Sequence, residues 1–514
     1  MTKPRIHLLH QAIAPRPNRR PHFGTFALVA LALFATQASA AESRSRPNIV
    51  LILADDIGYG DLGCYGATKV RTPNLDRLAR EGSRFTDAHA TASVCTPTRF
   101  ALLTGRYAWR QPGTGIAPGD ATLLIKPGTV TLASSLKSAG YSTGPVGKWH
   151  LGLGETTPDF NADLKPGPLE LGFDYAFFIP ATGDRTPCVF VENHRVVGLD
   201  PADPITVSYD KRIGTDPTGL ERPDLLKIKA DASHSQTIVN GISRIGYMTG
   251  GKKARWVDED IADTLTQRAV AFLDRQQSGK PFFLFLPTHD IHEPMVPHPR
   301  FRGTSECGWR GDVIHQLDWT VGQVLAALDR RGLAQDTLVI FTSDNGGAIK
   351  TTYDDGTNAL HALQSPNGVL RGTKGQLYEG GHRVPFISRW PGHIPAGRTS
   401  DALLGLIDLL PSFATLTAQK LPPGAAPDAV DVLPALLGAP GAQGRDTLVL
   451  QSNRQSPLAL RAGPWKLIER QNGPHELYDL ATDPTESVNL AARAPARVQA
   501  LAQRLAAERA KSTP

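Results

Sequence analysis

The stretch from Pro47 to Asp56, PNIVLILADD, decides the fold of this chain. Its apolar and mostly branched residues run continuously over the length of a β-strand. A strand that is buried on both faces has this pattern, which is typical of the parallel sheet of an α/β protein. Two adjacent carboxylates, Asp55 and Asp56, end the stretch. They either close the strand in an acidic turn or bind a hard cation, which prefers oxygen ligands.

Two further apolar runs end in polar residues in the same way. Phe282 to Leu286, FFLFL, leads into Thr288 to Pro294, THDIHEP. Thr337 to Thr342, TLVIFT, leads into Ser343 to Gly347, SDNGG. Open α/β sheets bind their ligands beyond the carboxyl ends of the strands. Because three separate strands carry such clusters, solvated turns are a poor explanation, and we expect a binding site there.

Helical patterns alternate with these strands and with several shorter ones. Together they predict an α/β fold with a large mixed, mostly parallel central sheet flanked by helices, and a smaller C-terminal α+β domain. The predicted helices cover Pro73–Glu81, Thr131–Ala139, Asp258–Gln276, Gly311–Arg331 and about Pro495–Lys511. Additional strands are predicted at Tyr141–Trp149, Phe386–Trp390, Thr447–Gln451 and Trp465–Glu469.

The length and composition allow two domains. The chain has 514 residues, and 40% of them are hydrophobic, which supports a large core. We expect a main domain over residues 44–415 and the C-terminal α+β subdomain over residues 416–514. Between residues 155 and 255 the sequence is rich in Pro, Gly and Asp and has little periodicity. This segment is too long for an ordinary connection, so we interpret it as an insertion that lines a substrate cleft; an excursion without function is the alternative.

Residues 1–40 have the pattern of an export signal. Five basic residues precede an apolar run from Phe26 to Ala35, and Ala38-Ser39-Ala40 forms a small-x-small cleavage pattern. This run is too short for a bilayer, which takes roughly 20 apolar residues. We therefore expect cleavage near Ala40 and an exported, periplasmic product without a membrane anchor. Arg19-Arg20 leaves the route open between general secretion and twin-arginine export.

The net charge argues against one class of partner. The chain carries a formal charge of +6, but residues 1–40 hold five basic and no acidic side chains, so the remainder carries +1. Nucleic-acid-binding proteins keep basic stripes in their folded domains. We therefore expect no nucleic-acid partner.

Cys95 is one of four cysteines, too few for a disulfide scaffold, and whether Cys188 pairs with Cys307 stays open. It lies in the stretch TASVCTPTRFALLTGRY. Pro97 suits the first turn of a helix because it lacks the N–H that would be unpaired there, which predicts Cys95 at a helix N-terminus. We expect the helix and Arg99 to lower the thiol pKa and to favour an anionic substrate. The alternative is a buried structural cysteine beside a helix-starting proline.

The motif around Cys95 carries a family resemblance. Cys95 to Arg99 form a C-x-P-x-R pattern, followed by Leu102 to Arg106, L-x-T-G-R. With these motifs the chain resembles the type I, arylsulfatase-like sulfatases of the alkaline phosphatase superfamily. In that family a formylglycine-generating enzyme oxidises this cysteine to formylglycine, an aldehyde whose hydrate is the catalytic nucleophile. Thr98 stands where many relatives have serine or alanine, and we expect the modification to survive this departure.

The resemblance covers nearly all of the mature chain and implies an alkaline phosphatase-like fold. The family's motifs occur in the family's order along the sequence. They lie at Asp55-Asp56, Cys95–Arg99, Gly147–Gly152, His292-Glu293-Pro294, Asp344–Gly347, Gly372–Gly381 and Glu476–Leu490.

The resemblance implies one divalent cation, usually Ca²⁺, with Mg²⁺ as the alternative. Besides the modified Cys95, the ligands would be four residues that offer oxygen atoms, a set that disfavours zinc. These are Asp55, Asp56, Asp344 and Asn345.

Six catalytic residues are implied in the same way, the nucleophile and five basic residues. They are Cys95, Arg99, Lys148, His150, His292 and Lys374. Arg99 and His150 would hold the hydrate, and the other three basic residues would contact the sulfate. Because a sulfate monoester is anionic, basic side chains must neutralise charge as it moves to the leaving oxygen. Either His292 or Lys374 would protonate the leaving alcohol, and His289 has only a secondary claim.

The implied function is hydrolysis of aryl or carbohydrate sulfate monoesters to an alcohol and inorganic sulfate. A phosphonate or phosphate monoester hydrolase, which shares this fold, is the alternative among enzymes. A two-zinc phosphatase would need a second Asp/His ligand set that the sequence does not show. Outside enzymes, the alternative is a silent periplasmic protein that binds sulfated glycans, although such a protein would not need Cys95. The identity of the sulfated substrate and the oligomeric state stay open.

Overall fold

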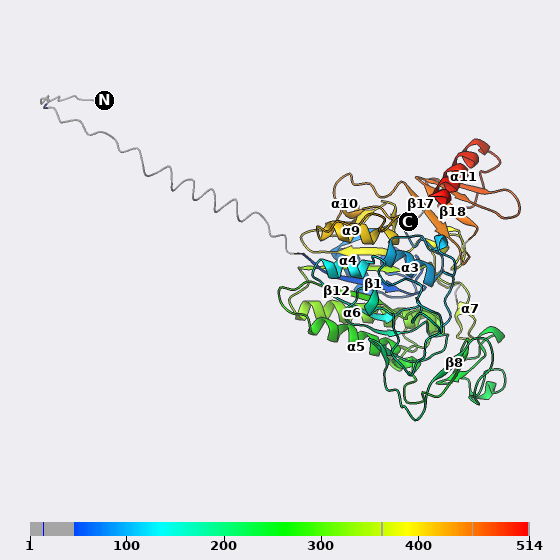
Figure 1. The fold of residues 1–514 in the computed structure, drawn as a ribbon. Coiled ribbons are helices and arrows are strands. Elements are labelled where there is room, and N and C mark those ends of the chain that lie inside the picture. Colours follow the sequence, from blue (N-terminus) through cyan, green and yellow to red (C-terminus); the bar gives the residue numbers. More distant parts are fainter. Residues whose placement is uncertain (1–13, 15–45, 361–362, 455, 512–514) are drawn as a thin grey trace, which may run out of the picture. The chain divides into compact units, whose positions relative to one another are not determined.

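The computed structural model describes Ala14 and residues 46–511, except 361–362 and 455 (Figure 1). The predicted export signal therefore lies outside the described residues, apart from Ala14. None of the described helices combines the length and the hydropathy that crossing a bilayer requires. The described α-helices are α2 (Pro73–Glu81), α3 (Cys95–Thr104), α4 (Leu132–Ser138), α5 (Ile261–Asp274), α6 (Gly308–Arg330), α7 (Thr357–Leu360), α8 (Glu379–His382), α9 (Leu409–Leu416), α10 (Leu433–Leu436) and α11 (Pro495–Ala510).

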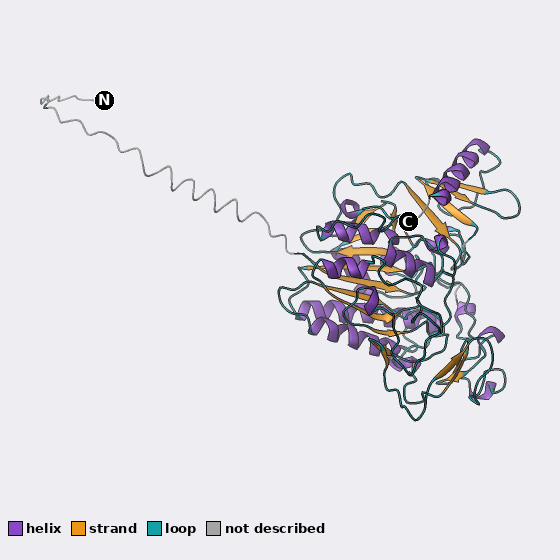
Figure 2. Cartoon of the chain, in the orientation of Figure 1, coloured by secondary structure: helices purple, strands orange, loops and turns teal. Residues whose placement is uncertain are grey.

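A ten-stranded sheet forms the centre of the main domain, with its strands drawn in orange in Figure 2. In spatial order the strands are β15 (Arg398–Ser400), β2 (Ser83–Phe85), β14 (Phe386–Arg389), β13 (Thr337–Ser343), β1 (Asn48–Ala54), β12 (Phe282–Pro287), β4 (Ser142–Lys148), β5 (Phe177–Ile179), β6 (Val191–Glu192) and β7 (Arg195–Val196). The five strands from β13 to β5 are parallel, whereas β14 runs antiparallel to both of its neighbours. The predicted mixed, mostly parallel sheet is confirmed.

Two groups of helices pack against this sheet. Helices α2 and α5 both contact α6, and α5 and α6 lie side by side in Figure 1. Helices α3, α4 and α10 all contact α9. Every residue of β1 is buried, as expected for a strand in the middle of a sheet with both faces covered. The apolar run that forms β1 thus lies at the centre of the core.

The predicted elements are confirmed, with shifts of at most three residues at their ends. The predicted strand over Pro47–Ala54 is β1, and the predicted helix over Thr131–Ala139 is α4. Helix α4 begins after Thr131, whose side chain accepts a hydrogen bond from the Ser134 N–H and so caps the helix.

Residues 155–255 contain more regular structure than the sequence indicates. Strands β5, β6 and β7 extend the central sheet. Two small antiparallel pairs follow, β8 (Thr206–Ser208) with β11 (Tyr247–Thr249) and β9 (Ile238–Val239) with β10 (Ile242–Ser243). Strands of two or three residues are too short to show an alternating pattern, which is why the sequence did not reveal them.

A separate antiparallel sheet forms the C-terminal α+β domain, and this prediction is confirmed. Its strands are β17 (Thr447–Gln451), β18 (Leu458–Ala462), β19 (Trp465–Ile468) and β20 (Glu476–Asp479), and α11 packs against β18 and β19. Apolar side chains such as Leu460, Leu467 and Leu505 give it its own buried cluster. The boundary at residue 416 stays a prediction.

The C-terminal sheet contacts the main domain directly before Cys95. The Gln451 N–H at the end of β17 donates to the Thr91 carbonyl group at 2.9 Å, and the Ser93 N–H donates to the Gln451 carbonyl group at 2.9 Å. Near this junction β3 (Ala88–His89) pairs with β16 (Leu404–Gly405). The segment that leads into α3 is therefore held between two domains.

Candidate active site

The carboxyl ends of β1, β12 and β13 bring the three predicted polar clusters together. Ala54 at the end of β1 is paired with Ser343 at the end of β13. Backbone hydrogen bonds continue past the strand ends: the Asp344 N–H donates to the Ala54 carbonyl group, and the Asp55 N–H donates to the Asp290 carbonyl group, both at 3.0 Å. The expectation that these clusters form one site is met by the topology.

Three aspartates and one asparagine lie at this edge and are all buried. Asn345 Nδ2 donates to Asp56 Oδ1 at 2.8 Å, and the Asp56 N–H donates to Asp344 Oδ1 at 3.4 Å. Asp56 has a φ of 58°, in the left-handed region that non-glycine residues seldom adopt. Burial, followed by the negative charge of Asp344, raises the pKa of Asp55 to about 7. The carboxylates therefore crowd one another in a space shielded from water.

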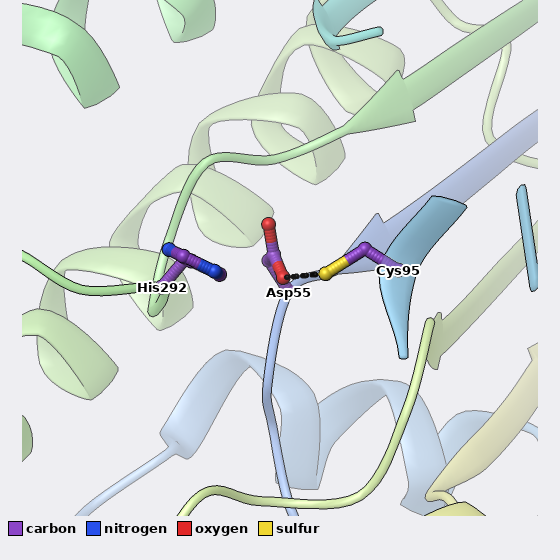
Figure 3. A group of neighbouring side chains, drawn as sticks. All are labelled: Asp55, Cys95 and His292. Atoms are coloured by element: carbon purple, nitrogen blue, oxygen red, sulfur yellow. Dashed lines mark hydrogen bonds between the residues drawn. The ribbon is translucent and has the colours of Figure 1, made fainter. Parts of the chain in front are cut away.

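Cys95 is the first residue of α3 and lies against these carboxylates, so its predicted place at a helix N-terminus is confirmed. Its Sγ is 3.5 Å from Asp55 Oδ1. Figure 3 shows Cys95 and His292 around Asp55, and one ligand atom from each lies within 4.8 Å of the others. The predicted lowering of the thiol pKa is wrong: burial, Asp344 and Asp55 raise the pKa of Cys95 to about 12. Burial and two carboxylates outweigh the helix dipole and the neighbouring lysines.

Two buried basic residues pair with the carboxylates. Arg99, one turn after Cys95, donates from Nε and Nη2 to Asp344 Oδ2 at 3.0 and 2.8 Å. Lys148, the last residue of β4, forms an ion pair with Asp55. Both side chains are at most 1% exposed, so their charges act in a medium of low polarity.

Lys374 marks the open side of the site. Its Nζ is 2.8 Å from Asp56 Oδ2, and its side chain is 20% exposed. Although burial works against the charge, Asp56 and Cys95 raise the pKa of Lys374 well above its usual value, so the ammonium group stays protonated. A cavity of about 540 Å³ adjoins Lys374 and is lined by two short loops that include Lys350 and Gln376.

His150 presents one free nitrogen to the site. Its Nε2 is 2.9 Å from the carbonyl group of Ala117, and because a carbonyl group accepts, Nε2 carries the proton. Its buried Nδ1 has no hydrogen-bond partner among the described residues. Burial, followed by Lys148, lowers the pKa of His150 well below its usual value. The neutral ring is therefore a hydrogen-bond acceptor at Nδ1.

His292 is fixed from the other side. Its Nδ1 is 2.6 Å from the Glu293 carbonyl group and 3.0 Å from Thr182 Oγ1, which assigns the proton to Nδ1. Its Nε2 is 3.9 Å from Asp56 Oδ2. Burial, followed by Lys374, lowers the pKa of His292 well below its usual value. Nε2 thus faces the site without a proton as long as the ring is neutral.

The donor set fits a hard divalent cation. Asp55, Asp56, Asp344 and Cys95 each offer one atom, and these atoms all lie within 4.8 Å of one another. Asn345 Oδ1 is buried and has no hydrogen-bond partner among the described residues, because the amide uses its Nδ2 to donate to Asp56. A buried oxygen atom without a partner is costly unless a ligand binds it. Several oxygen atoms around one point are typical of a Ca²⁺ or Mg²⁺ site.

The structure brings together all ten residues that the sequence analysis assigns to the site, around the ends of β1, β4, β12 and β13. His289 lies at the edge of the group. Two further histidines, His298 and His315, serve local structure: His298 caps a short helical turn, and His315 accepts a hydrogen bond from the Arg71 N–H.

The sequence analysis missed a second polar group beside His292. Asp184, His234 and Glu293 each offer one ligand atom within 4.8 Å of the others, and Arg185 pairs with Asp184 at 2.6 Å. Asp184 and Arg185 follow the short buried strand β5. The same signal of an apolar run followed by polar residues was therefore present in FFIPATGDR, at reduced length.

Comparisons with known proteins show the family of the chain. A family model described as Sulfatase matches residues 47–419. The N-acetylgalactosamine-6-O-sulfatase of Bacteroides thetaiotaomicron is 49% identical over 485 residues, which cover 91% of this chain and 94% of that protein. The steryl-sulfatase of Mus musculus is 37% identical over 441 residues, which cover 80% of this chain and 68% of that protein.

A solved structure is similar to nearly the whole chain. Its description names the metabolism of multiple glycosaminoglycans by Bacteroides thetaiotaomicron. It superposes with a TM-score of 0.89 at 49% identity and covers 91% of this chain and 100% of that chain. The similarity extends over both the central sheet and the C-terminal sheet.

Proposed function

This chain belongs to the sulfatase family and is a sulfuric ester hydrolase, and from this premise we propose that it hydrolyses a carbohydrate sulfate with a formylglycine made from Cys95 and one divalent cation. Cys95 carries the proposal, because its Sγ lies at a helix N-terminus within 4.8 Å of ligand atoms of three buried aspartates. A cysteine with a merely structural role has no need of a surrounding set of cation ligands and basic residues.

The position of Cys95 supports its modification. Its Sγ lies 3.5 Å from Asp55 Oδ1, and Arg99 and Lys148 pair with the carboxylates around it. Formylglycine, as the hydrate, would supply one hydroxyl group to attack sulfur and a second whose loss of a proton expels sulfate. Arg99 and His150 would position this group, since Arg99 lies one turn further along α3 and His150 Nδ1 is available as an acceptor.

The cation would be Ca²⁺, with Mg²⁺ as the alternative, and would neutralise charge on a sulfate oxygen atom. Asp55, Asp56, Asp344 and Asn345 would hold it together with the modified Cys95. The Arg99 guanidinium fixes Asp344 through two hydrogen bonds, which orients this carboxylate toward its neighbours. Such support of the ligands is needed for a precise site.

Lys148, His292 and Lys374 would contact the sulfate, and Lys374 is the favoured proton donor to the leaving alcohol. The Lys374 ammonium group stays charged and lies on the open side of the site. The neutral His292 ring holds its proton on Nδ1, so Nε2 could donate only after it gains a proton. His292 is therefore better suited to bind the substrate, and to act as the acid only when protonated.

The carbohydrate substrate is supported by the relative that is named for N-acetylgalactosamine 6-O-sulfate. The identity of 49% over nearly the whole chain makes this sugar sulfate the first compound to test. We also propose export to the periplasm with cleavage near Ala40, and a main domain that ends near residue 415.

The decisive test combines a mass measurement with turnover. The tryptic peptide Phe85–Arg99, from protein made in its own host, is expected to have the mass of a chain with an aldehyde in place of the Cys95 thiol. The same protein is expected to release sulfate from N-acetylgalactosamine 6-O-sulfate and from para-nitrophenyl sulfate. Faster release of phosphate from the matched aryl phosphate would contradict the sulfate substrate. If Cys95 is unmodified and the protein binds the sugar sulfate without turnover, the result would favour a glycan-binding protein over an enzyme.

A further inference from the structure

The turn from Thr182 to Arg185 connects the 155–255 segment to the site. The Arg185 N–H donates to the Thr182 carbonyl group at 3.1 Å and closes the turn. Thr182 Oγ1 lies 3.0 Å from His292 Nδ1. A Cβ atom on Gly183 would lie 2.4 Å from Cε1 of His289, so only glycine lets the turn pack on this ring. The turn therefore rests on two histidines that follow β12.

Hydrogen bonds to the backbone of the turn hold it in place. The Ile245 N–H donates to the Asp184 carbonyl group at 2.7 Å. Arg244, which is fully buried and paired with Asp258 at 2.7 Å, donates to the carbonyl group of Gly183. A backbone fixed in this way holds its side chains in a defined position, as a binding site requires.

The turn presents hydrogen-bonding groups that the protein itself does not use up. Arg185 donates from Nη1 to both oxygen atoms of Asp184, at 2.7 and 2.6 Å, and its side chain forms no other hydrogen bond within the described part of the chain. A guanidinium group has five N–H donors, so most of them are left for a ligand. The imidazole of His289 has no hydrogen-bond partner among the described residues, although its Nδ1 is buried.

These groups lie close to the reacting centre. Thr182 of the same turn is 3.0 Å from His292, and Asp184 offers a ligand atom within 4.8 Å of one from Glu293, whose carbonyl group is 2.6 Å from His292 Nδ1. The side chain of Arg185 is 15% exposed, so part of the guanidinium group is accessible to a ligand.

We propose that Asp184 and Arg185, together with His289, form the subsite that binds the hydroxyl groups of the sugar next to the sulfate ester. This inference rests on the proposed carbohydrate substrate. A pyranose ring presents neighbouring hydroxyl groups that both donate and accept hydrogen bonds. The carboxylate accepts from them and the guanidinium donates to them, while the neutral His289 contributes a further acceptor or donor.

A second cation site is the competing interpretation of this cluster. Asp184, His234 and Glu293 offer ligand atoms close to one another, and His234 Nε2 lies 3.3 Å from Asp184 Oδ2. The guanidinium of Arg185 already lies 2.6 Å from the same carboxylate, so its charge opposes a second cation there. Hydroxyl groups, which are neutral, suffer no such repulsion.

The test compares two substrates that share the sulfate but not the sugar. Wild-type protein, Asp184→Asn, Arg185→Ala and the control Arg222→Ala are assayed with N-acetylgalactosamine 6-O-sulfate and with para-nitrophenyl sulfate. Arg222 belongs to the same segment and forms an exposed ion pair with Asp224, so the control should leave both activities as in wild type. Each of the other two variants should lose about 100-fold in kcat/KM on the sugar sulfate, because unpaired polar groups then remain in the subsite. The loss on the aryl sulfate should be at least about tenfold smaller.

A binding measurement supplies a second readout. N-acetylgalactosamine, the sugar without sulfate, should inhibit aryl sulfate hydrolysis by wild-type protein competitively, and Arg185→Ala should abolish this inhibition. Equal losses on both substrates, or no loss on the sugar sulfate, would overturn the subsite and leave the proposed function intact. A wild-type protein that hydrolyses the aryl sulfate but no sugar sulfate would overturn the carbohydrate substrate and the subsite with it.

Discussion

Two clusters of buried charge lie in the described part of the chain, and they are built differently. The sulfate site contains Asp55, Asp56, Asp344, Asn345, Cys95, Arg99, Lys148 and Lys374. The interdomain cluster joins the main domain to the C-terminal sheet and contains His89, Glu379, His382, Arg461, Lys466 and Glu486. Both contain carboxylates that are fully buried, but the pKa of Asp55 is raised whereas the pKa of Glu379 is lowered.

The difference lies in what occupies the middle of each cluster. Lys466 Nζ is 2.9 Å from Glu379 Oε1, 2.8 Å from Glu486 Oε1 and 3.0 Å from His382 Nε2. Burial alone would raise the pKa of Glu379, but Lys466 and Arg461 hold it well below its usual range. The ammonium group of Lys466 thus already occupies the place that a metal cation would take in the interdomain cluster.

In the sulfate site each of the three carboxylates instead has a basic partner of its own, and the pKa of Asp55 is still raised to about 7. Asn345 Oδ1 has no partner within the described residues. The comparison teaches that burial and formal charge do not distinguish a binding site from a structural cluster. A buried oxygen atom that is left without any partner, as in Asn345, does, and the following predictions test this distinction.

The largest effect is expected at the nucleophile. Cys95→Ser should lower steady-state sulfate release by about a thousandfold or more, because serine supplies one hydroxyl group and has no second one to expel the sulfate. The protein should accumulate in a sulfated form that intact mass spectrometry detects. Cys64→Ser, which replaces a free cysteine outside the site, is the matched control. Rapid steady turnover by Cys95→Ser would refute the proposed mechanism.

Removal of the proposed cation should affect the sulfate site and leave the interdomain cluster unchanged. Chelation should lower activity by about 100-fold or more, since the charge that stabilises the transition state is lost. Added Ca²⁺ or Mg²⁺ should then raise the melting temperature of wild-type protein by a few degrees through binding to the folded state.

Asp344→Asn should abolish this thermal response, whereas Asp263→Asn, which removes a carboxylate of an ion pair with Arg300 outside both clusters, should keep it. An equal response in Asp344→Asn and wild type would place the cation elsewhere.

A substitution in the interdomain cluster should lower the stability of the fold and leave catalysis nearly unchanged. Lys466→Met should lower the free energy of unfolding by about 3–5 kcal/mol, because it removes the cation that two buried carboxylates share. Denaturant titration measures this loss, and kcat of the protein that remains folded should stay within about twofold of wild type.

The double variant Lys466→Met/Glu379→Gln should recover part of the stability. A large fall in kcat with unchanged stability would assign this cluster to the reaction.

The smallest expected effect is a pH dependence. Because Glu379 has a lowered pKa in the folded state, it contributes stability above its ordinary pKa of about 4.5, and the contribution is lost as the pH falls through the lowered value. The difference in unfolding free energy between wild type and Glu379→Gln should therefore shrink below about pH 4.5. Urea titrations at several pH values measure it, and a difference that grows toward low pH would contradict the assignment.

The sequence predicted the centre of the molecule well. Apolar runs such as Phe282–Leu286 are typical of buried strands, and the polar residues at their ends then meet at one edge of the sheet. The motif around Cys95 correctly predicted a helix N-terminus. Its thiol pKa was predicted wrongly, because the sequence cannot show that Asp55 and Asp344 approach the sulfur atom.

The Thr182–Arg185 turn could not be predicted for a different reason. It is positioned by contacts with His289, His292 and Arg244, which lie more than 60 residues away in the sequence. Strand β5, which delivers it, has only three residues and shows no period. Function that depends on such long-range contacts leaves little local pattern.

The pairing of Gln451 with Thr91 and Ser93 has a consequence for the order of events during biosynthesis. Cys95 is 2% exposed in the complete fold, and the strand that pairs with the segment before it is made of residues that lie about 350 positions later. The proposed oxidising enzyme would bind the chain around Cys95 while this strand contact is still open. The proposed maturation therefore belongs to the period before the two domains close on each other, and a fully folded, unmodified protein should be a poor substrate for it.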